Sequence, residues 1–545
     1  MKEGVFLKTL CRTLLTRHPR KPNSPLHLQM DRLERYCYNP TLRWNPQVEE
    51  YFIKAYGADY FHRISTALTR PSCYSCIRVN TLQSTTGDVI EKLLAILQER
   101  RQQNGSSDGT NVCHISDDLA KATLGSSETI LPNKSVQDCF IEKCQIPSLD
   151  YVVFVKGSGP HTIDYGHIAN KPPKEVVVSR KCAEAVLRGA QVYVPGVLAC
   201  SAHVEKGEVV AVSVAVEQPS STGGWGVGFT RGTILQGSQT DPYYFERKGL
   251  YIGQGTTVMS RAGIFRASEG VAVDMVHRIY KLPSFRDILE GEIFLQNLPS
   301  IITAHALDPQ EGERILDMCA APGGKTTAIA ILMKDKGEVI AVDRSHNKVH
   351  LLNLIGGLEQ MGNESHISKA ELRKNNRKLR NGPGRNNCLG GRVEKSKGFP
   401  PNSFDRVLLD APCSALGLRP RLFAGEETME SLRTHAKYQR RMFDQAVQLV
   451  RPGGVIVYST CTINPGENEA LVRYALDTYK FLSLASQFPR VGGPGLVGGY
   501  QFSDEYKEEW LRHGEEDLVQ RFDPSSPLDT IGFFIAKFSV GSKDV

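Results

Sequence analysis

The stretch from residue 286 to 538 alternates strand-like and helix-like runs, and this alternation constrains the fold more than any other feature. Short apolar runs bounded by turn residues indicate buried strands, and longer runs with helical spacing follow them. Strands that alternate with helices form parallel sheets covered by helices on both faces. We therefore expect an α/β domain with a Rossmann-like, doubly wound sheet. The expected strands are 315–318, 338–342, 404–409, 455–458 and 531–538, and the expected helices include 326–332 and 438–449.

Two further units are expected before this domain. Residues 43–175 combine a helical pattern at 45–60, a strand at 76–81 and a second helix at 89–97, which predicts a small α/β unit. A segment rich in Gln, Asn, Gly and Ser follows from 100 to 130 and is typical of a flexible linker. Residues 176–276 change to short β-rich runs separated by turn glycines, which favours a compact β-barrel. Residues 1–42 form a basic extension, either a disordered arm or an organelle transit peptide.

Composition narrows the classes of protein. Thirteen cysteines are scattered over 545 residues, without the dense regular spacing of secreted disulfide frameworks. We expect free thiols in a reducing compartment, the cytoplasm, with an organelle or the nucleus as alternatives. No run approaches the roughly 18 to 20 apolar residues that span a membrane, so we expect a soluble protein without a membrane partner. The net charge is +7, and residues 367–397 hold ten Lys or Arg against two Glu, a solvated loop or a contact for nucleic acid.

Two cysteines follow neighbouring strands of the expected sheet. Cys413 comes directly after the run 407–412, and Cys461 comes directly after the run 455–460. In parallel α/β sheets, ligands bind beyond the carboxyl ends of the strands, so both thiols are expected in one crevice. A free cysteine is usually a small buried hydrophobe. Two thiols at adjacent strand ends, one of them near Asp410, instead favour a catalytic pair in which one thiol attacks and the other manages a proton.

A glycine turn and an aspartate point to a nucleotide-like ligand. Gly323 and Gly324 lie between an expected strand and an expected helix, where backbone amides can approach a ligand. The patterns of dinucleotide-binding and P-loop proteins are absent, which disfavours a dehydrogenase or an NTPase. Asp343 ends the next strand, where a carboxylate either caps a helix or binds two ribose hydroxyls. With the glycine turn before it, Asp343 favours an adenosine-containing ligand.

Several motifs resemble those of the NOP/Sun family of RNA cytosine-C5 methyltransferases, which use S-adenosylmethionine (SAM). They are Asp-Met-Cys-Ala-Ala-Pro-Gly-Gly-Lys-Thr-Thr at 317–327, Asp-Ala-Pro-Cys-Ser at 410–414 and Tyr-Ser-Thr-Cys-Thr at 458–462, with shorter matches at 78–81, 294–300 and 467–469. Residues 185–196 resemble a PUA domain, an RNA-binding barrel. The resemblance implies a SAM-dependent methyltransferase domain at 277–540, an RNA-binding role for 43–175, and tRNA methylated near its 3′ acceptor end as substrate. An rRNA substrate is the alternative.

The resemblance also implies roles for single residues. Carbon 5 of cytosine is a weak nucleophile, so a thiolate first adds at carbon 6. Cys461 is implied as this nucleophile and Cys413 as the group that promotes its release, although the swapped assignment stays open because DNA cytosine methyltransferases use a Pro-Cys nucleophile. Asp410 is implied to hydrogen-bond or protonate N3 of the base. The implied SAM-binding residues are Cys319, Ala320, Ala321, Pro322, Gly323, Gly324, Lys325, Asp343 and Asp410.

Other features bear on RNA, the cofactor and metals. Arg188, Tyr193 and Lys206 are candidate contacts to RNA phosphates and a stacked base, the alternative being a packed tyrosine and a solvated arginine. The family supplies an aspartate from its third strand, but no aspartate lies between Asp343 and Asp405, which keeps open a catalytically impaired RNA-binding protein. The pair at 73 and 76 has zinc-like spacing, yet no second pair matches it, so no metal site is expected.

Overall fold

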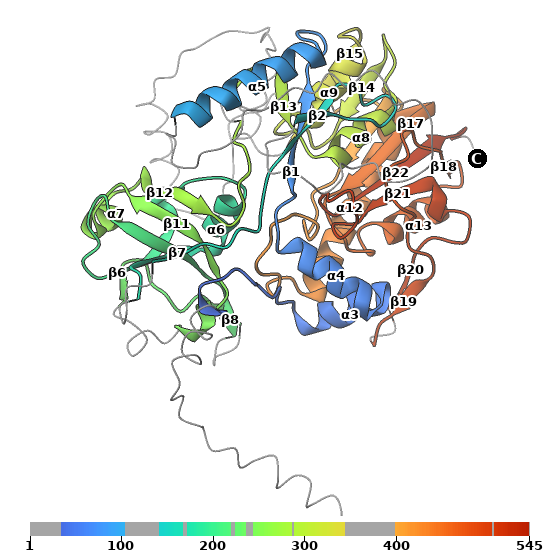
Figure 1. Cartoon of the computed structure of the whole chain (residues 1–545). Coiled ribbons are helices and arrows are strands. Elements are labelled where there is room, and N and C mark those ends of the chain that lie inside the picture. Colours follow the sequence, from blue (N-terminus) through green and yellow to red (C-terminus); the bar gives the residue numbers. More distant parts are fainter. Residues whose placement is uncertain are drawn as a thin grey trace, which may run out of the picture.

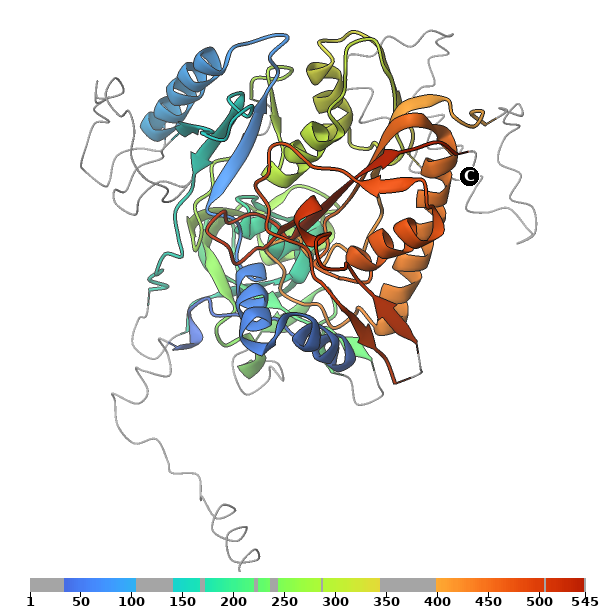
Figure 2. The same ribbon diagram turned by 90° about the vertical axis from the view of Figure 1, so that its right-hand side faces the viewer.

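The computed structural model describes residues 34–103, 141–166, 172–219, 224–235, 244–285, 288–343, 398–503 and 506–543. Three larger sheets organise these residues, one each in an N-terminal unit, a barrel and a C-terminal domain. Figure 1 shows the barrel on one side of the molecule and the C-terminal domain on the other, and Figure 2 views the molecule from the side of that domain. No helix in the described ranges is long and apolar enough to cross a membrane.

The sheet of the C-terminal domain has the strand order β15-β14-β16-β17-β22-β18, with β21 beside β22. Strands β15, β14, β16 and β17 run parallel, as the alternating pattern predicts. The last strand, β22, was expected in the same parallel array but runs antiparallel to β17. It also pairs antiparallel with β21, and antiparallel neighbours need no crossover helix between them. The strands are β14 (Arg314–Asp317), β15 (Glu338–Ala341), β16 (Phe404–Asp410), β17 (Val450–Thr460), β18 (Leu482–Leu484), β21 (Val519–Phe522) and β22 (Phe533–Val540).

Helices cover both faces of this sheet. Leu408 and Val457 point to one face, where they share a core with helices α8 and α9. Leu409 and Tyr458, one residue further along each strand, belong to a second core with helices α12 and α13. Because successive side chains of a strand point to opposite faces, both faces need apolar cover and the strands read as continuous apolar runs. These helices are α8 (Leu298–Leu307), α9 (Gly324–Leu332), α12 (Met429–Leu449) and α13 (Glu469–Thr478).

The N-terminal sheet has the order β13-β1-β3-β2. Its edge strand β13 follows the barrel in sequence and lies inside the range 277–540 that was expected for the C-terminal domain. In the structure it belongs to the N-terminal sheet instead, because Leu295 of β13 pairs with Ile77 of β1. Helix α5 begins at Thr86 and buries Val89 and Leu93 in a core that extends into the C-terminal domain. The expected linker falls mostly outside the described residues. The elements are β1 (Tyr74–Val79), β2 (Ile141–Lys143), β3 (Val152–Lys156), β13 (Ile293–Leu295) and α5 (Thr86–Gln103).

The helical pattern at 45–60 forms two helices rather than one. Helix α3 (Pro46–Tyr56) and helix α4 (Ala58–Leu68) are separated by Gly57, whose φ of 82° is in the region that favours glycine. Their apolar faces pack with Leu416 and Ile463 of the C-terminal domain, not with the N-terminal sheet. Both helices therefore support the loops that follow β16 and β17.

The barrel contains a seven-stranded sheet with the order β10-β6-β4-β7-β11-β12-β5 and a valine-rich core of its own. The barrel is inserted between β3 and β13, and its two connections pair with each other: backbone N–H to O distances between Ser158 and Lys281 are 2.9 and 2.8 Å. The elements are β4 (Glu175–Ser179), α6 (Arg180–Leu187), β5 (Val192–Tyr193), β6 (Val197–Ser201), β7 (Val209–Ala215), β10 (Thr233–Leu235), β11 (Tyr251–Thr257), α7 (Arg261–Arg266) and β12 (Val271–Arg278).

The barrel also contacts the loop that follows β16. Leu422 and Phe423 are buried in the barrel core, although they belong to the C-terminal domain. The backbone N–H of Leu422 donates to the carboxylate of Glu184 on α6 at 3.0 Å, and Arg180 donates to Glu426 at 3.1 Å. The barrel and the loop after Cys413 are thus packed as one unit.

Candidate active site

The parallel strands bring the predicted site residues to one edge of the sheet. Asp317 ends β14, Asp410 ends β16, and Cys461 directly follows β17. Asp343 lies two residues beyond the end of β15. The carboxyl ends of parallel strands are where α/β folds bind ligands, so a crevice at this edge is the candidate active site.

The two cysteines lie side by side. The Sγ atoms of Cys413 and Cys461 are 3.3 Å apart, and both side chains are half-buried free thiols. The hydrogen bond with Cys461 and burial raise the pKa of the Cys413 thiol well above its ordinary value, with further contributions from the charges of Cys461 and Glu467. The two thiols therefore share one site beyond the ends of β16 and β17.

Asp410 is held by two donors from neighbouring elements. Lys325 Nζ of α9 lies 2.6 Å from Asp410 Oδ2, and Ser459 Oγ of β17 donates to Asp410 Oδ1 at 2.7 Å. Both contacts fix the orientation of a half-buried carboxyl group next to the Cys413 loop. Lys325 and Asp410 were predicted as site residues, whereas Ser459 was not assigned a role.

The turn between β14 and α9 has the geometry of a ligand cradle. Gly323 has a φ of 108°, which favours glycine, and α9 starts at the next residue. A Cβ on Gly324 would lie 3.1 Å from the ring of Phe294, so a larger residue here would require this ring to shift by a few tenths of an ångström. Asp343 Oδ2 accepts a hydrogen bond from the backbone N–H of Ala321 at 3.1 Å, which ties the end of the second strand to the turn.

The charges around this turn suit a ligand with hydroxyl and amino groups. Burial and the nearby carboxylates of Asp410, Asp317 and Asp343 raise the pKa of the Cys319 thiol to about 12. Burial likewise raises the pKa of Asp317 to about 6, while Thr326 Oγ1 donates to its carboxylate at 2.7 Å. Carboxylates next to a helix N-terminus and Lys325 match the ribose hydroxyls, amino group and carboxylate of SAM. The residues present therefore fit this cofactor.

Arg78 links the N-terminal sheet to this cradle, whereas in the sequence it was recognised only as part of a motif that resembles the family. Its side chain is 2% exposed and donates to Gln296 Oε1 at 2.8 Å and to Thr327 Oγ1 at 2.7 Å. A weaker contact reaches the carbonyl of Gly324 at 3.3 Å. Burial lowers the pKa of Arg78 to about 10. In the sequence, only the position of Arg78 between Ile77 and Val79 in an apolar strand indicates that its side chain is buried.

The structure places the predicted RNA contacts on the surface of the barrel. Arg188 and Lys206 are exposed, and Tyr193 is 44% exposed at the end of β5 rather than packed in the barrel core. Arg188 also lines a groove of about 410 Å³ together with Asn297 and Leu418, between the barrel, the N-terminal sheet and the C-terminal domain. No group of His, Cys, Asp or Glu suited to a metal ion occurs among the described residues.

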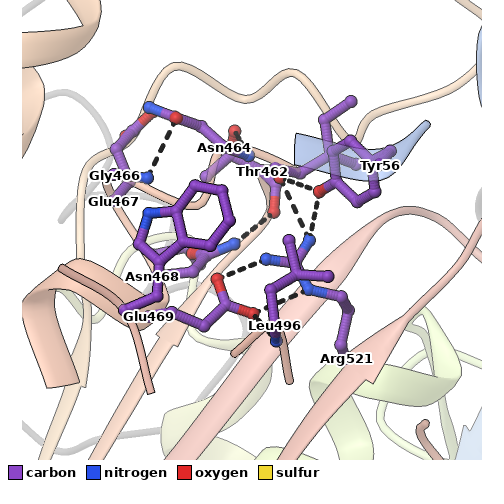
Figure 3. A network of polar contacts seen from close by, with 12 residues as sticks. Tyr56, Thr462, Asn464, Gly466, Glu467, Asn468, Glu469, Leu496 and Arg521 are labelled. Atoms are coloured by element: carbon purple, nitrogen blue, oxygen red, sulfur yellow. Dashed lines mark hydrogen bonds and ion pairs between the residues drawn. The ribbon is translucent and has the colours of Figure 1, made fainter. Parts of the chain in front are cut away.

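A buried polar network supports the segment after Cys461 (Figure 3). Glu469 is completely buried and accepts a hydrogen bond from Arg521 Nε at 2.9 Å and another from the backbone N–H of Leu496 at 3.0 Å. Arg521 also donates to the carbonyl of Ile463 at 3.0 Å and contacts the hydroxyl of Tyr56. The network joins α3, α13 and β21 around the loop that carries Cys461.

Loss of this ion pair is expected to destabilise the fold. In Glu469→Gln the guanidinium of Arg521 stays buried without its carboxylate, so we expect the free energy of unfolding to fall by about 3–5 kcal/mol. Chemical denaturation followed by circular dichroism measures it. The matched control is Glu509→Gln, which breaks the exposed Lys507–Glu509 pair and should leave the unfolding midpoint unchanged. Equal midpoints for both variants would contradict a stabilising role for the network.

Comparisons with known proteins agree with this site. The family model described as 16S rRNA methyltransferase RsmB/F matches residues 304–539, and the PUA domain model matches residues 174–215. The rRNA (cytosine-C(5))-methyltransferase NOP2C of Arabidopsis thaliana is 60% identical over 94% of this chain and 93% of that protein. The chain belongs to the NOP/Sun family of RNA (cytosine-C5)-methyltransferases. It is thus a SAM-dependent RNA cytosine-C5 methyltransferase with a PUA barrel.

Members named as tRNA enzymes are similar along most of this methyltransferase. The tRNA (cytosine(72)-C(5))-methyltransferase NSUN6 of Mus musculus is 37% identical over 74% of this chain and 81% of that protein. The crystal structure of NSun6 from Pyrococcus horikoshii with SFG has a TM-score of 0.60 and 27% identity, covering 92% of this chain and 99% of that one. The expected family, barrel and class of enzyme are confirmed.

Proposed function

We propose that this methyltransferase modifies a cytosine near the acceptor end of tRNA, with Cys461 as the nucleophile and Cys413 as the residue that promotes its release. The observation that carries the proposal is the 3.3 Å separation of the two Sγ atoms beside Asp410. Two thiols this close can reach the same base, so one can add to it and the other can assist the later elimination. The resemblance of the motifs at 410–414 and 458–462 to those of the NOP/Sun family supports this division of roles over the swapped one.

The chemistry follows from the weak nucleophilicity of carbon 5. The Cys461 thiolate forms a bond to carbon 6, which shifts electron density toward carbon 5 and N3. Asp410, oriented by Lys325 and Ser459, hydrogen-bonds or protonates N3 and stabilises this density. After methyl transfer to carbon 5, the proton on that carbon passes to water, and the electron pair of the C–H bond forms the double bond between carbons 5 and 6. The bond from carbon 6 to sulfur breaks with its electron pair on Cys461, any proton on N3 returns to Asp410, and Cys413 assists this elimination. The base regains its aromatic ring and Cys461 its thiolate.

SAM supplies the methyl group, and the chain supplies its binding site. Asp343 would bind the ribose hydroxyls, and Lys325 with the backbone of 319–324 would surround the methionine end. The segment in which the family provides a third-strand aspartate lies outside the described residues. The SAM site proposed here therefore consists of residues from the described part of the chain.

The Asp343 carboxylate provides a direct test of the cofactor site. In Asp343→Ala the ribose hydroxyls lose a charged acceptor, so we expect the Kd for SAM to rise by roughly tenfold to a hundredfold, since hydrogen bonds to charged groups contribute about 1.5–3 kcal/mol. Isothermal titration calorimetry on the full chain measures it. Asp517→Asn, at an exposed ion pair with Arg490, is the control and should bind SAM as the unmodified chain does. An unchanged Kd for SAM in Asp343→Ala would refute the role of this carboxylate at the ribose.

RNA recognition is proposed for the barrel and the groove beside it. Arg188 and Lys206 supply cations for phosphates, and the exposed ring of Tyr193 offers a surface for a stacked base. The groove lined by Arg188 and Leu418 adjoins the crevice, because the next residue back, Gly417, donates its N–H to the carbonyl of Cys461 at 3.0 Å. A base in a stem must be extruded to enter, which favours weakly paired ends.

Two substrates have support. The likeness to NSUN6 over most of the chain, barrel included, supports tRNA. The 60% identity to a protein named as an rRNA methyltransferase supports rRNA as the second candidate. Bisulfite sequencing of tRNA and rRNA after incubation with the purified protein and SAM distinguishes them. We expect 5-methylcytosine near the acceptor end of tRNA, whereas modification confined to rRNA would overturn the tRNA proposal.

A further inference from the structure

A second carboxylate lies behind the thiol pair and is distinct from Asp410. Glu467 is completely buried, six residues after Cys461. In the part of the chain that the structure describes, it has no ion pair with a lysine, arginine or histidine. Burying a carboxylate without a cation costs free energy unless hydrogen bonds stabilise its charge. The groups that donate these hydrogen bonds therefore indicate the role of Glu467.

The donors come from the loops of both cysteines. The backbone N–H of Ser414 donates to Glu467 Oε2 at 3.0 Å, and Ser414 Oγ donates to Oε1 at 2.5 Å. From the other loop, Asn464 Nδ2 donates to Oε1 at 3.0 Å. Ser414 directly follows Cys413, and Asn464 lies three residues after Cys461, so one carboxylate joins the two loops.

Two further contacts complete this connection. Gln439 Nε2 of α12 donates to Glu467 Oε2 at 2.7 Å and to the carbonyl of Pro412 at 3.0 Å, which fixes the residue before Cys413 as well. The hydroxyls of Ser414 and Thr462, each adjacent to a catalytic cysteine, lie 2.8 Å apart. Residues on both sides of Cys413 are therefore fastened to Glu467 directly or through Gln439.

We propose that Glu467 is a positioning residue that sets the spacing of the Cys413 and Cys461 thiols for addition and elimination at the same base. It touches neither RNA nor SAM and acts through the loops that it binds. Its charge also contributes to the raised pKa of the Cys413 thiol. The inference rests on the proposed roles of the two cysteines.

Replacing the carboxylate by an amide tests this role. In Glu467→Gln one oxygen becomes an NH₂ group that faces donors from Ser414 or Gln439, so the loops must shift. We expect kcat to fall by about 100-fold, the cost of displacing reacting groups by about 1 Å, with the KM values for RNA and SAM unchanged. The pH midpoint for alkylation of Cys413 by iodoacetamide, followed by peptide mass spectrometry, should move to lower pH because a negative charge is lost.

Asp444→Asn is the matched control. Asp444 is a half-buried carboxylate on α12 with neutral donors, the hydroxyls of Tyr474 and Tyr479, both at 2.8 Å, and neither belongs to a cysteine loop. We expect this variant to keep the unmodified kcat and the unmodified alkylation midpoint. Equal losses of kcat in both variants, or a raised KM with kcat intact in Glu467→Gln, would overturn the positioning role.

A milder variant keeps the proposal testable if Glu467→Gln does not fold. Ser414→Ala removes one of the four hydrogen bonds to Glu467 but leaves the backbone N–H in place. It should lower kcat by a smaller factor, again without a change in KM, and an unmodified kcat would then overturn the proposal. The unmodified protein is assayed alongside: no methyl transfer by it would refute the proposed function, whereas a normal kcat in the variants would refute only the positioning role.

Discussion

Cys461→Ala should abolish methyl transfer, with kcat lower by roughly 10⁴-fold or more, because in the proposed mechanism the Cys461 thiolate forms the bond to carbon 6. The same variant should form no covalent complex with RNA on a denaturing gel. Cys413→Ala should instead accumulate such a complex, because addition proceeds while elimination is slowed. Transfer of a tritiated methyl group from SAM and the gel assay measure both outcomes.

The two variants differ only in which of two neighbouring thiols is removed, so each controls for the other. Cys200→Ala removes a buried thiol of the barrel and should retain full transfer with no trapped complex. A complex with Cys461→Ala and none with Cys413→Ala would reverse the assignment and make Cys413 the nucleophile. Full transfer by either variant would remove that cysteine from the mechanism.

Asp410→Asn should lower kcat by roughly 10²–10⁴-fold, the usual contribution of a general acid. The amide can still accept a hydrogen bond from Lys325 or Ser459 but cannot provide a proton or a charge at N3 of the base. RNA binding by fluorescence anisotropy should be unchanged, and single-turnover methyl transfer should show the loss. The decrease should extend to formation of the trapped complex in a Cys413→Ala background, because stabilisation of N3 assists the addition step.

Asp444 offers a matched control in the same domain. It is a half-buried aspartate on α12 that accepts hydrogen bonds from the hydroxyls of Tyr474 and Tyr479, both at 2.8 Å. Asp444→Asn should keep the unmodified kcat. If Asp410→Asn transfers methyl groups at the same rate as Asp444→Asn, the base is activated without this carboxylate.

The order of strands and helices and the meeting of the two thiols could be predicted from the sequence. Both depend on local patterns: apolar runs identify strands buried on two faces, and the rule for parallel strand ends places Cys413 beside Cys461. The glycine turn was equally accessible, because positive φ at Gly323 reflects the conformational freedom of glycine. Which thiol attacks has no local signal and came from resemblance alone.

Long-range pairing could not be predicted from these patterns. An apolar run does not encode strand direction, so the antiparallel β22 was missed. Strands β13 and β1 pair although the whole barrel lies between them in sequence. The helical pattern at 45–60 did not reveal the break at Gly57. The burial of Arg78 and Glu467 was missed because charged side chains are mostly exposed, and only their partners explain them. The basic run 367–397 lies outside the described residues.

The paired connections of the barrel have a consequence for target choice. Two chain segments that are hydrogen-bonded to each other lead into the barrel, and Leu422 and Phe423 pack into it on the other side. With these two attachments, we expect the barrel surface to keep a constant distance from the crevice. An RNA bound to that surface would place in the crevice the nucleotide that lies a fixed number of nucleotides from the bound position. Lengthening the RNA between the two points by one nucleotide should therefore move the methylated position by one, whatever base sequence surrounds it.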